Sequence, residues 1–255
     1  MSDLYETTAV VLAGGLGTRL RSAVADRPKA LARIAARPFL TFLLDQLHAA
    51  GVRNAVLCTG YLGEQIAKTF GDEYRGLRLT YSQEQSPLGT GGALRSVLAK
   101  LTSDPVLVLN GDSYCETDLP ALLDWHRKHR AEATLLLTSV PDTQRYGRVA
   151  VDQHDAVVAF EEKGHAGGPG RINAGIYVLG RRFLLTIPAT CAPSLEHDVF
   201  PTWIGRGLSG CPAGGRFLDI GTPESYAAAE EFFADAAKFP PACKEFFAHD
   251  KDGLA

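Results

Sequence analysis

The chain has 255 residues, of which 45% are hydrophobic and 22% are charged, a composition that suits one large globular domain or one and a half small ones. The formal net charge of −3 argues against nucleic acid as a partner, because nucleic-acid binders usually carry a basic surplus. Five scattered cysteines without a Cys-x-x-Cys pair, a start unlike a signal peptide, and no apolar run near ~20 residues favour a reduced, cytoplasmic setting and no membrane partner.

The first half of the chain alternates between expected strands and helices. Strands are predicted at 7–12, 55–58, 77–81, 106–109 and 133–140, and helices at 38–51, 62–70, 92–101 and 119–130. Apolar strands that alternate with helices are typical of a mostly parallel sheet covered on both faces. We therefore expect an α/β fold with a Rossmann-like, mixed and mostly parallel sheet flanked by helices.

The second half changes character. Short strands at 149–151 and 157–160 flank a hairpin-like turn, and further strands are expected at 174–179 and 216–220. Helices are predicted at 195–204 and from Thr222, an N-cap before Pro223, to about residue 233. We expect a single domain over residues 1–240 and a tail at 241–255 that is either an accessory helix or partly disordered.

A loop with three glycines follows the first predicted strand. Gly14, Gly15 and Gly17 allow backbone N–H groups to approach phosphate oxygens, and Arg19 and Lys29 supply positive charge nearby. A P-loop would need Gly-Lys-Ser/Thr here, and a dinucleotide fingerprint would need glycine at the position of Leu20. The segment therefore predicts a phosphate-binding loop of another kind; a mere strand-to-helix turn would not need the two cations.

Acidic residues end two other predicted strands. Asp112 follows Asn110-Gly111 after the strand at 106–109, so it is expected at the same sheet edge as the glycine loop. A carboxylate there suits Mg²⁺, which prefers oxygen ligands and substrate phosphates. Asp219 is a weaker candidate of the same kind. Helix capping is the alternative reading of both.

Three further motifs carry polar side chains beside glycines or at strand ends. Glu162 and Lys163 end a predicted strand, where they could hold a sugar phosphate at the rim of a cleft or form an exposed charge run. Tyr146-Gly147 and the segment from Asn173 to Gly175 each place a glycine beside a hydrogen-bonding side chain. None of the three is specific by itself.

Taken together, these motifs resemble the nucleoside-diphosphate-sugar pyrophosphorylases, which are sugar-1-phosphate nucleotidyltransferases. The signature Gly-Gly-x-Gly-Thr-Arg-Leu followed by Pro-Lys-x-Leu is present at 14–20 and 28–31. The match continues at 87–93, 111–112, 162–163, 173–175 and 219–223, and covers roughly residues 7 to 235. The resemblance implies a nucleotide-diphospho-sugar transferase (GT-A-like) fold, with a nucleotide-binding part at about 7–140 and a small β-rich sugar-binding part at about 141–235.

The resemblance also implies roles for individual residues. Arg19, Lys29 and Asp112 would be catalytic, and Asp112 and Asp219 would hold Mg²⁺. The nucleotide would be bound by Leu12, Ala13, Gly14, Gly15, Gly17, Thr18, Arg19, Glu84, Pro87, Gly89, Thr90 and Asn110. The sugar phosphate would be bound by Tyr146, Gly147, Glu162, Lys163, Asn173 and Gly175.

Substrate identity rests on finer features. The segment from Arg21 to Asp26 departs from the usual family pattern, and it looks like the D-glycero-α-D-manno-heptose 1-phosphate guanylyltransferases, as do 37–40, 145–147 and 194–196. Glu84 falls where the family reads the base, and a carboxylate can accept both N1–H and N2–H of guanine, which favours GTP. The expected reaction yields GDP-heptose and pyrophosphate, for surface polysaccharide or glycan synthesis.

Several alternatives stay open. Mannose 1-phosphate with GTP, or glucose or N-acetylmuramate 1-phosphate with UTP or dTTP, could replace the favoured pair. The chain could also be a catalytically silent regulatory subunit that binds a nucleotide sugar, although the intact set of Arg19, Lys29, Asp112 and Asp219 argues against this, or an unrelated nucleotide-binding module. The sequence leaves open whether the chain forms a homo-oligomer.

Overall fold

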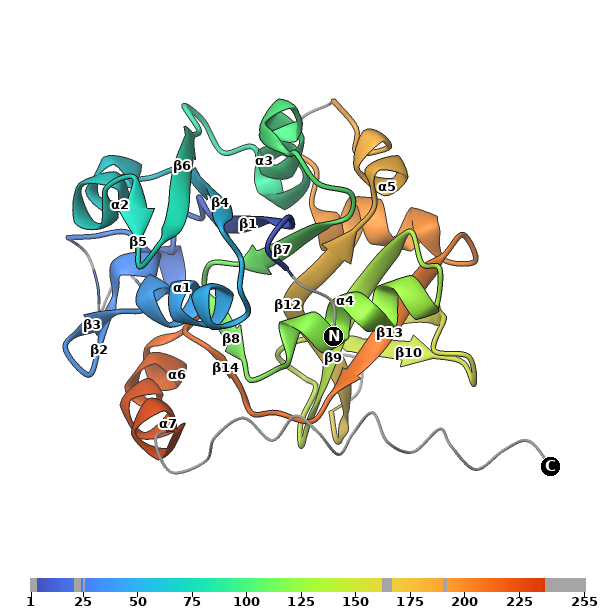
Figure 1. The fold of residues 1–255 in the computed structure, drawn as a ribbon. Coiled ribbons are helices and arrows are strands. Elements are labelled where there is room, and N and C mark those ends of the chain that lie inside the picture. The colour runs from blue at the N-terminus through green and yellow to red at the C-terminus, as the bar shows by residue number, and fades with distance from the viewer. Residues whose placement is uncertain (1–3, 21–23, 25, 162–166, 190–191, 237–255) are drawn as a thin grey trace.

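The computed structural model describes residues 4–20, 24, 26–161, 167–189 and 192–236. Its centre is an eight-stranded sheet (Figure 1). The strands lie in the order β13 (Leu208–Ala213), β9 (Ala133–Val140), β12 (Gly170–Leu179), β7 (Val106–Asn110), β1 (Thr8–Ala13), β4 (Asn54–Thr59), β6 (Leu77–Gln83) and β5 (Glu73–Tyr74). Strands β7, β1, β4 and β6 pair in parallel, whereas β12 is antiparallel to both of its neighbours. The expected mixed, mostly parallel α/β sheet is confirmed.

Alternate residues of the buried central strand β1 belong to two separate hydrophobic clusters, one on each face of the sheet. Ala9 and Val11 share a cluster with side chains of α1 (Leu40–Ala49), α2 (Gly63–Phe70) and α4 (Leu119–Lys128). Val10 belongs to the other cluster, with α3 (Gly89–Ser96) and α5 (Arg181–Leu185). This period of two, with every one of these β1 side chains buried, explains why the strand is apolar throughout.

Several expected helices differ from the structure. The helix predicted to begin at Pro38 begins at Leu40, because Pro38 lies in the two-residue strand β3 (Arg37–Pro38). The helix predicted at 92–101 begins earlier, at Gly89, and ends at Ser96, before a short 3₁₀ turn at Leu98–Lys100. Its start packs on the backbone near Pro193, whose carbonyl accepts from the Gly91 amide at 2.8 Å. The segment predicted to be helical at 195–204 is helical from Leu195 to Trp203, but not as one regular helix: Leu195–Val199 is a single π-helical turn and Phe200–Trp203 is a 3₁₀ helix that contains Pro201. Proline lacks the N–H that a continuing helix needs.

Two strands of three or more residues, β13 and β8 (Ser113–Cys115), escaped the sequence analysis. Strand β13 contains Gly210 and Pro212 and has no apolar alternation, but it pairs in parallel with β9 at the edge of the sheet, where proline is tolerated. Strand β8 (Ser113–Cys115) is short and pairs antiparallel with β14 (Phe217–Asp219), so that Ser113 lies opposite Asp219. The Ile220 amide also donates to the Asp112 carbonyl at 3.0 Å. This ladder brings together two segments about one hundred residues apart.

The remaining elements pack around these sheets. Strands β10 (Arg148–Val151) and β11 (Val157–Glu161) form the expected hairpin, and β2 (Arg33–Ile34) pairs with β3 (Arg37–Pro38). The predicted last helix is split into α6 (Pro223–Ala227), which Thr222 caps as expected, and α7 (Ala229–Ala236). The tail at 241–255 lies outside the described residues. Among those described, no helix is both long and apolar enough to cross a lipid bilayer.

Candidate active site

Two adjoining cavities open at the carboxyl ends of β1 and β7. The first measures about 400 Å³ and the second about 730 Å³. Both are lined by Arg19, Asn110, Asp112 and Glu196, so they are two parts of one cleft. All twelve residues that the sequence analysis assigned to the nucleotide line the first cavity. The structure thus gathers them from β1, the glycine loop, α3 and β7, while their binding roles stay predictions.

Close contacts around Gly14 leave no room for a side chain in this part of the glycine loop. A Cβ on Gly60 would lie 2.4 Å from the Gly14 carbonyl oxygen, and a Cβ on Gly14 would lie 2.9 Å from Glu84 Oε1. Gly17 has a φ of +59°, in the left-handed region that glycine adopts without strain. Strand β1 therefore ends in a loop whose backbone faces the cavity directly.

Glu84 follows β6 and is fixed by two neighbours. Its amide donates to the Thr59 carbonyl at 2.8 Å, and its Oε2 accepts from the Leu88 amide at 3.0 Å. Burial raises the pKa of this carboxyl, and the hydrogen bond from Leu88 partly offsets that effect. One carboxylate oxygen is therefore anchored at the start of α3, and the other lies against Gly14.

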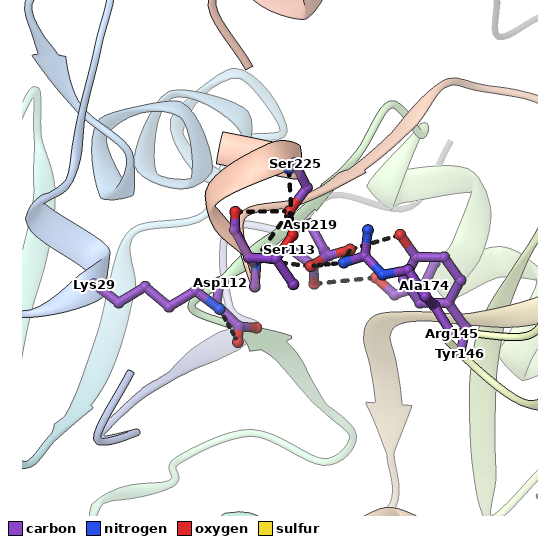
Figure 2. A network of polar contacts seen from close by, with 10 residues as sticks. Lys29, Asp112, Ser113, Arg145, Tyr146, Ala174, Asp219 and Ser225 are labelled. Carbon is purple, nitrogen blue, oxygen red and sulfur yellow. Dashed lines mark hydrogen bonds and ion pairs between the residues drawn. The ribbon is translucent and has the colours of Figure 1, made fainter. Parts of the chain in front are cut away.

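Lys29 and Asp112 form an ion pair within the cleft (Figure 2). Lys29 Nζ lies 2.8 Å from Asp112 Oδ2, and the lysine side chain is 12% exposed while that of the aspartate is 51% exposed. Lys29 begins a 3₁₀ turn whose next residues, Ala30 and Leu31, are buried in the core. Core packing therefore anchors the backbone from which the lysine reaches the cleft.

Asp219 is held more tightly than Asp112. Its Oδ2 accepts from the Tyr146 hydroxyl at 2.6 Å and from Arg145 Nη2 at 3.1 Å, and its Oδ1 accepts from the Gly221 amide at 2.7 Å. A Cβ on Gly221 would lie 2.5 Å from Asp219 Oδ1 and 3.8 Å from Lys29 Nζ. The carboxylate and the lysine ammonium therefore face the same point, and only glycine fits there.

The donor set suits magnesium. Within the described part of the chain, no group of three or more His, Cys, Asp and Glu side chains is placed to hold a metal. Asp112 and Asp219 nevertheless lie on backbone-paired segments beside the cleft. A metal held by one or two carboxylates, with water and substrate phosphates as the other ligands, is the usual arrangement for Mg²⁺. The residues present fit that ion.

Four of the six residues predicted to bind the sugar phosphate line the second cavity: Tyr146, Gly147, Asn173 and Gly175. The other two, Glu162 and Lys163, lie outside the described residues. Gly175 has a φ of +75° at an irregularity of β12, and a Cβ there would lie 2.5 Å from Ser113 Oγ. Glycine at this position therefore keeps β12 close to β8.

Glu196 lines both cavities and was named in the sequence only as part of a subfamily motif. Its Oε1 accepts from the Tyr177 hydroxyl and from Asn173 Nδ2, both at 3.2 Å. Tyr177 is fully buried, and burial raises the pKa of its hydroxyl well above the usual value, so it stays a donor. Arg145 and Arg148, which also line the second cavity, were not assigned a role either. The residues around a single charged side chain in the sequence do not indicate whether that side chain faces a cavity.

Comparisons with known proteins agree with this geometry. Residues 8–236 match the family model described as nucleotidyl transferase. The chain is 41% identical over 226 residues to mannose-1-phosphate guanylyltransferase of Mycobacterium tuberculosis, covering 87% of this chain and 63% of that protein. It is 36% identical over 224 residues to D-glycero-α-D-manno-heptose 1-phosphate guanylyltransferase of Aneurinibacillus thermoaerophilus, covering 88% of this chain and 96% of that protein.

A solved structure shares both fold and sequence. HddC from Yersinia pseudotuberculosis, crystallised in complex with GMP-PN, superposes with a TM-score of 0.79 at 33% identity and covers 89% of this chain and 99% of its own. The family that the glycine loop and later motifs predicted is confirmed. The chain belongs to the nucleotidyl transferase family.

Proposed function

We propose that this protein is a sugar-1-phosphate guanylyltransferase that joins GTP and D-glycero-α-D-manno-heptose 1-phosphate into GDP-heptose and pyrophosphate. The observation that carries the proposal is the two-part cleft, in which a glycine-loop cavity and a second polar cavity meet at Asp112. Two substrates with phosphate groups must meet at such a junction for the transfer to occur. The guanylyltransferase relatives and the GMP-PN complex of a related protein support guanine as the base.

The chemistry needs no protein nucleophile. A phosphate oxygen of the sugar 1-phosphate attacks the α-phosphorus of GTP in line, and the bond to the bridging oxygen of pyrophosphate breaks. The attacking phosphate is already an anion, so no general base has to remove a proton. The cost lies in bringing two anions together, which is on the order of several kcal/mol at ~4 Å in a partly dry site.

The side chains of the cleft suit the task of offsetting that repulsion. Arg19 lines both cavities, and Lys29 lies at their junction beside Asp112. The positive charges of Arg19 and Lys29 would stabilise the two phosphates as they approach each other. The fixed positions of these side chains would also orient the phosphates. Mg²⁺ bound by Asp112 and Asp219 would supply further neutralisation of phosphate charge.

Glu84 is the proposed reader of the base. One of its oxygens is anchored by the Leu88 amide, and the carboxylate lines the first cavity. Guanine presents the N1–H and N2–H donors side by side, so a carboxylate acceptor suits it better than it suits uracil or thymine, which present one N–H between two acceptors.

Heptose 1-phosphate is favoured by the motif at Arg145-Tyr146-Gly147 and by similarity to two heptose 1-phosphate guanylyltransferases, at 36% and 37% identity. Mannose 1-phosphate is the second candidate, because the M. tuberculosis mannose enzyme is 41% identical. The second cavity, at about 730 Å³, has room for either sugar.

One experiment tests the proposal directly. Four nucleoside triphosphates are combined with heptose, mannose, glucose and N-acetylmuramate 1-phosphates, and pyrophosphate release is measured for each pair with Mg²⁺. We expect the highest kcat/KM for GTP with heptose 1-phosphate. A maximum with mannose 1-phosphate would support the second candidate. Binding of nucleotide sugars without pyrophosphate release from any pair would indicate a regulatory subunit.

A further inference from the structure

The four charged side chains at the junction form two neighbouring ion pairs. Arg145 pairs with Asp219, and Lys29 pairs with Asp112 (Figure 2). A Cβ on Gly221 would lie 2.5 Å from Asp219 Oδ1 and 3.8 Å from Lys29 Nζ, so the two pairs are neighbours. Two cations and two anions cancel, so the cluster is neutral as it stands. A metal ion that enters it meets carboxylates that already have positive partners.

The two carboxylates are not equally available. Asp112 contacts Lys29 through one oxygen, and half of its side chain is exposed. Asp219 is 15% exposed, and both of its oxygens accept hydrogen bonds: Tyr146 donates to Oδ2, the Gly221 amide donates to Oδ1, and Arg145 donates to both. Burial and the bond to Asp219 raise the pKa of the Tyr146 hydroxyl above its usual value, so it remains a donor. Asp219 is therefore the less available of the two carboxylates as a metal ligand.

Arg145 is the partner that can leave. It lies between β9 and β10, its side chain is 46% exposed, and it lines the second cavity. A phosphate monoester in that cavity offers the guanidinium two oxygens with the bidentate geometry that arginine prefers. Tyr146 and the Gly221 amide hold the carboxylate without charge, so they do not repel a cation that replaces Arg145.

We propose that Arg145 blocks Asp219 as a metal ligand in the free protein, and that the phosphate of the bound sugar 1-phosphate draws Arg145 away and thereby tightens metal binding. Arg145 is then a positioning residue that couples the two binding events. Because coupling is reciprocal, metal also tightens the binding of the sugar phosphate. The inference rests on the proposed function for the identity of the anion. The contact between Arg145 and Asp219 does not depend on the proposed function.

The test uses Mn²⁺ as the probe and the whole chain without nucleotide, so that no turnover occurs. Free Mn²⁺ is measured by electron paramagnetic resonance during titration of wild-type protein, Arg145→Met and Arg148→Met. Arg148 lines the same cavity and carries the same charge, but its ion pair is with Glu161, at 3.8 Å. We expect Arg145→Met to tighten Mn²⁺ binding about tenfold, and Arg148→Met to change it by less than about threefold.

Two further variants separate the contact from general charge effects and from folding. Tyr146→Phe removes one hydrogen bond to Asp219 without changing charge, and a smaller tightening of about threefold is expected. Adding Asp219→Asn to Arg145→Met should cancel the gain. Equal tightening by Arg145→Met and Arg148→Met, or tightening that survives Asp219→Asn, would overturn the proposal. If Arg145→Met does not fold, Arg145→Lys is measured in its place; this variant keeps the positive charge but loses the forked guanidinium. The proposal is also overturned if Arg145→Lys leaves the Mn²⁺ affinity unchanged and Tyr146→Phe has no effect on it.

The second arm adds D-glycero-α-D-manno-heptose 1-phosphate at saturation, with its own binding measured by calorimetry without metal. We expect it to tighten Mn²⁺ binding in the wild-type protein and to add little in Arg145→Met. If the sugar phosphate does not bind at all, the proposed substrate is wrong, whereas the ligand-free comparison still decides the role of Arg145. If it binds but tightens Mn²⁺ equally in both proteins, the coupling through Arg145 is wrong and the proposed function stands.

Discussion

The ammonium group of Lys29 lies 2.8 Å from Asp112 Oδ2, although 83 positions separate the two residues in the chain. The lysine comes from a 3₁₀ turn after the glycine loop and the aspartate lies two residues after β7; both line the first cavity, and Asp112 lines the second as well. A cation and an anion at this junction affect any phosphate that enters from either side. The roles of Lys29 and Asp112 can therefore each be tested by enzyme kinetics.

Asp112→Asn is expected to lower kcat by about 100-fold or more, because the amide keeps the shape of the side chain but loses the charge that would hold a metal. The fold should stay intact, since the Asp112 side chain is half exposed and the amide oxygen of asparagine can still accept the hydrogen bond from Lys29 Nζ. Pyrophosphate release and thermal unfolding are the measurements. Asp72→Asn, at an exposed position outside the cleft, is the matched control. Near-normal turnover of Asp112→Asn would remove Asp112 from the proposed metal site.

Lys29→Met should lower kcat more than it raises KM for the sugar phosphate, because charge that builds up as the two phosphates meet is stabilised most in the transition state. Initial rates at varied concentrations of each substrate separate the two effects. Lys68→Met changes an exposed lysine on α2 and serves as the control. A rise in KM with unchanged kcat would assign Lys29 to substrate binding only.

Glu84→Gln is expected to reduce kcat/KM for GTP about 10- to 100-fold relative to UTP, the range expected for loss of a bidentate base contact. The Leu88 amide already donates to one carboxylate oxygen at 3.0 Å, so the amide oxygen of glutamine would take that place. Its NH₂ group would then face the donors of guanine. The ratio of GTP to UTP activity is measured, with Gln85→Ala, at the exposed neighbouring position, as the control. An unchanged ratio would show that other groups read the base.

His126 predicts a pH dependence of stability. Burial, aided by the nearby charge of Arg127, lowers its pKa to about 4, from 6.5, and its Nδ1 lies 2.9 Å from Thr134 Oγ1. The folded protein keeps this ring neutral down to about pH 4, whereas the unfolded chain takes up the proton near pH 6.5. Stability should therefore fall as the pH drops through this window, by up to about 3 kcal/mol in total, and level off below it.

Denaturant unfolding between pH 4 and 7.5 checks this prediction. In His126→Gln the glutamine does not titrate, so the free energy of unfolding should fall less steeply with pH than in the wild-type protein. His154→Gln, at an exposed position, should keep the wild-type slope. Parallel slopes for the wild-type protein and His126→Gln would show that this ring does not control the acid sensitivity.

Much of the cleft could be predicted from the sequence because its parts have local signals. The β-branched run of β1 and the alternation of strands with helices predict a parallel sheet. Such a sheet places the glycine loop and Asp112 at one edge. All twelve residues predicted for the nucleotide lie around the first cavity. A short stretch of sequence is enough to show where glycines lie and where strands end.

Other parts depend on contacts between distant segments. Strand β13 has no apolar alternation of its own and exists through its pairing with β9. Strand β8 is three residues long, and only its ladder with β14 brings Asp219 to Asp112. Glu196, which lines both cavities, lies on a π-helical turn, and the apolar pattern of the predicted helix at 195–204 did not indicate that form.

The sequence by itself determined the chemistry on offer: a glycine loop, two cations near it, and carboxylates at strand ends. Only the tertiary structure decided which charges meet, pairing Lys29 with Asp112 and Arg145 with Asp219. The physical reason is the distance along the chain over which each kind of interaction acts. Backbone conformation and apolar periodicity are local properties that a few neighbouring residues set, whereas these two ion pairs form only because the fold brings together side chains that lie far apart in the chain.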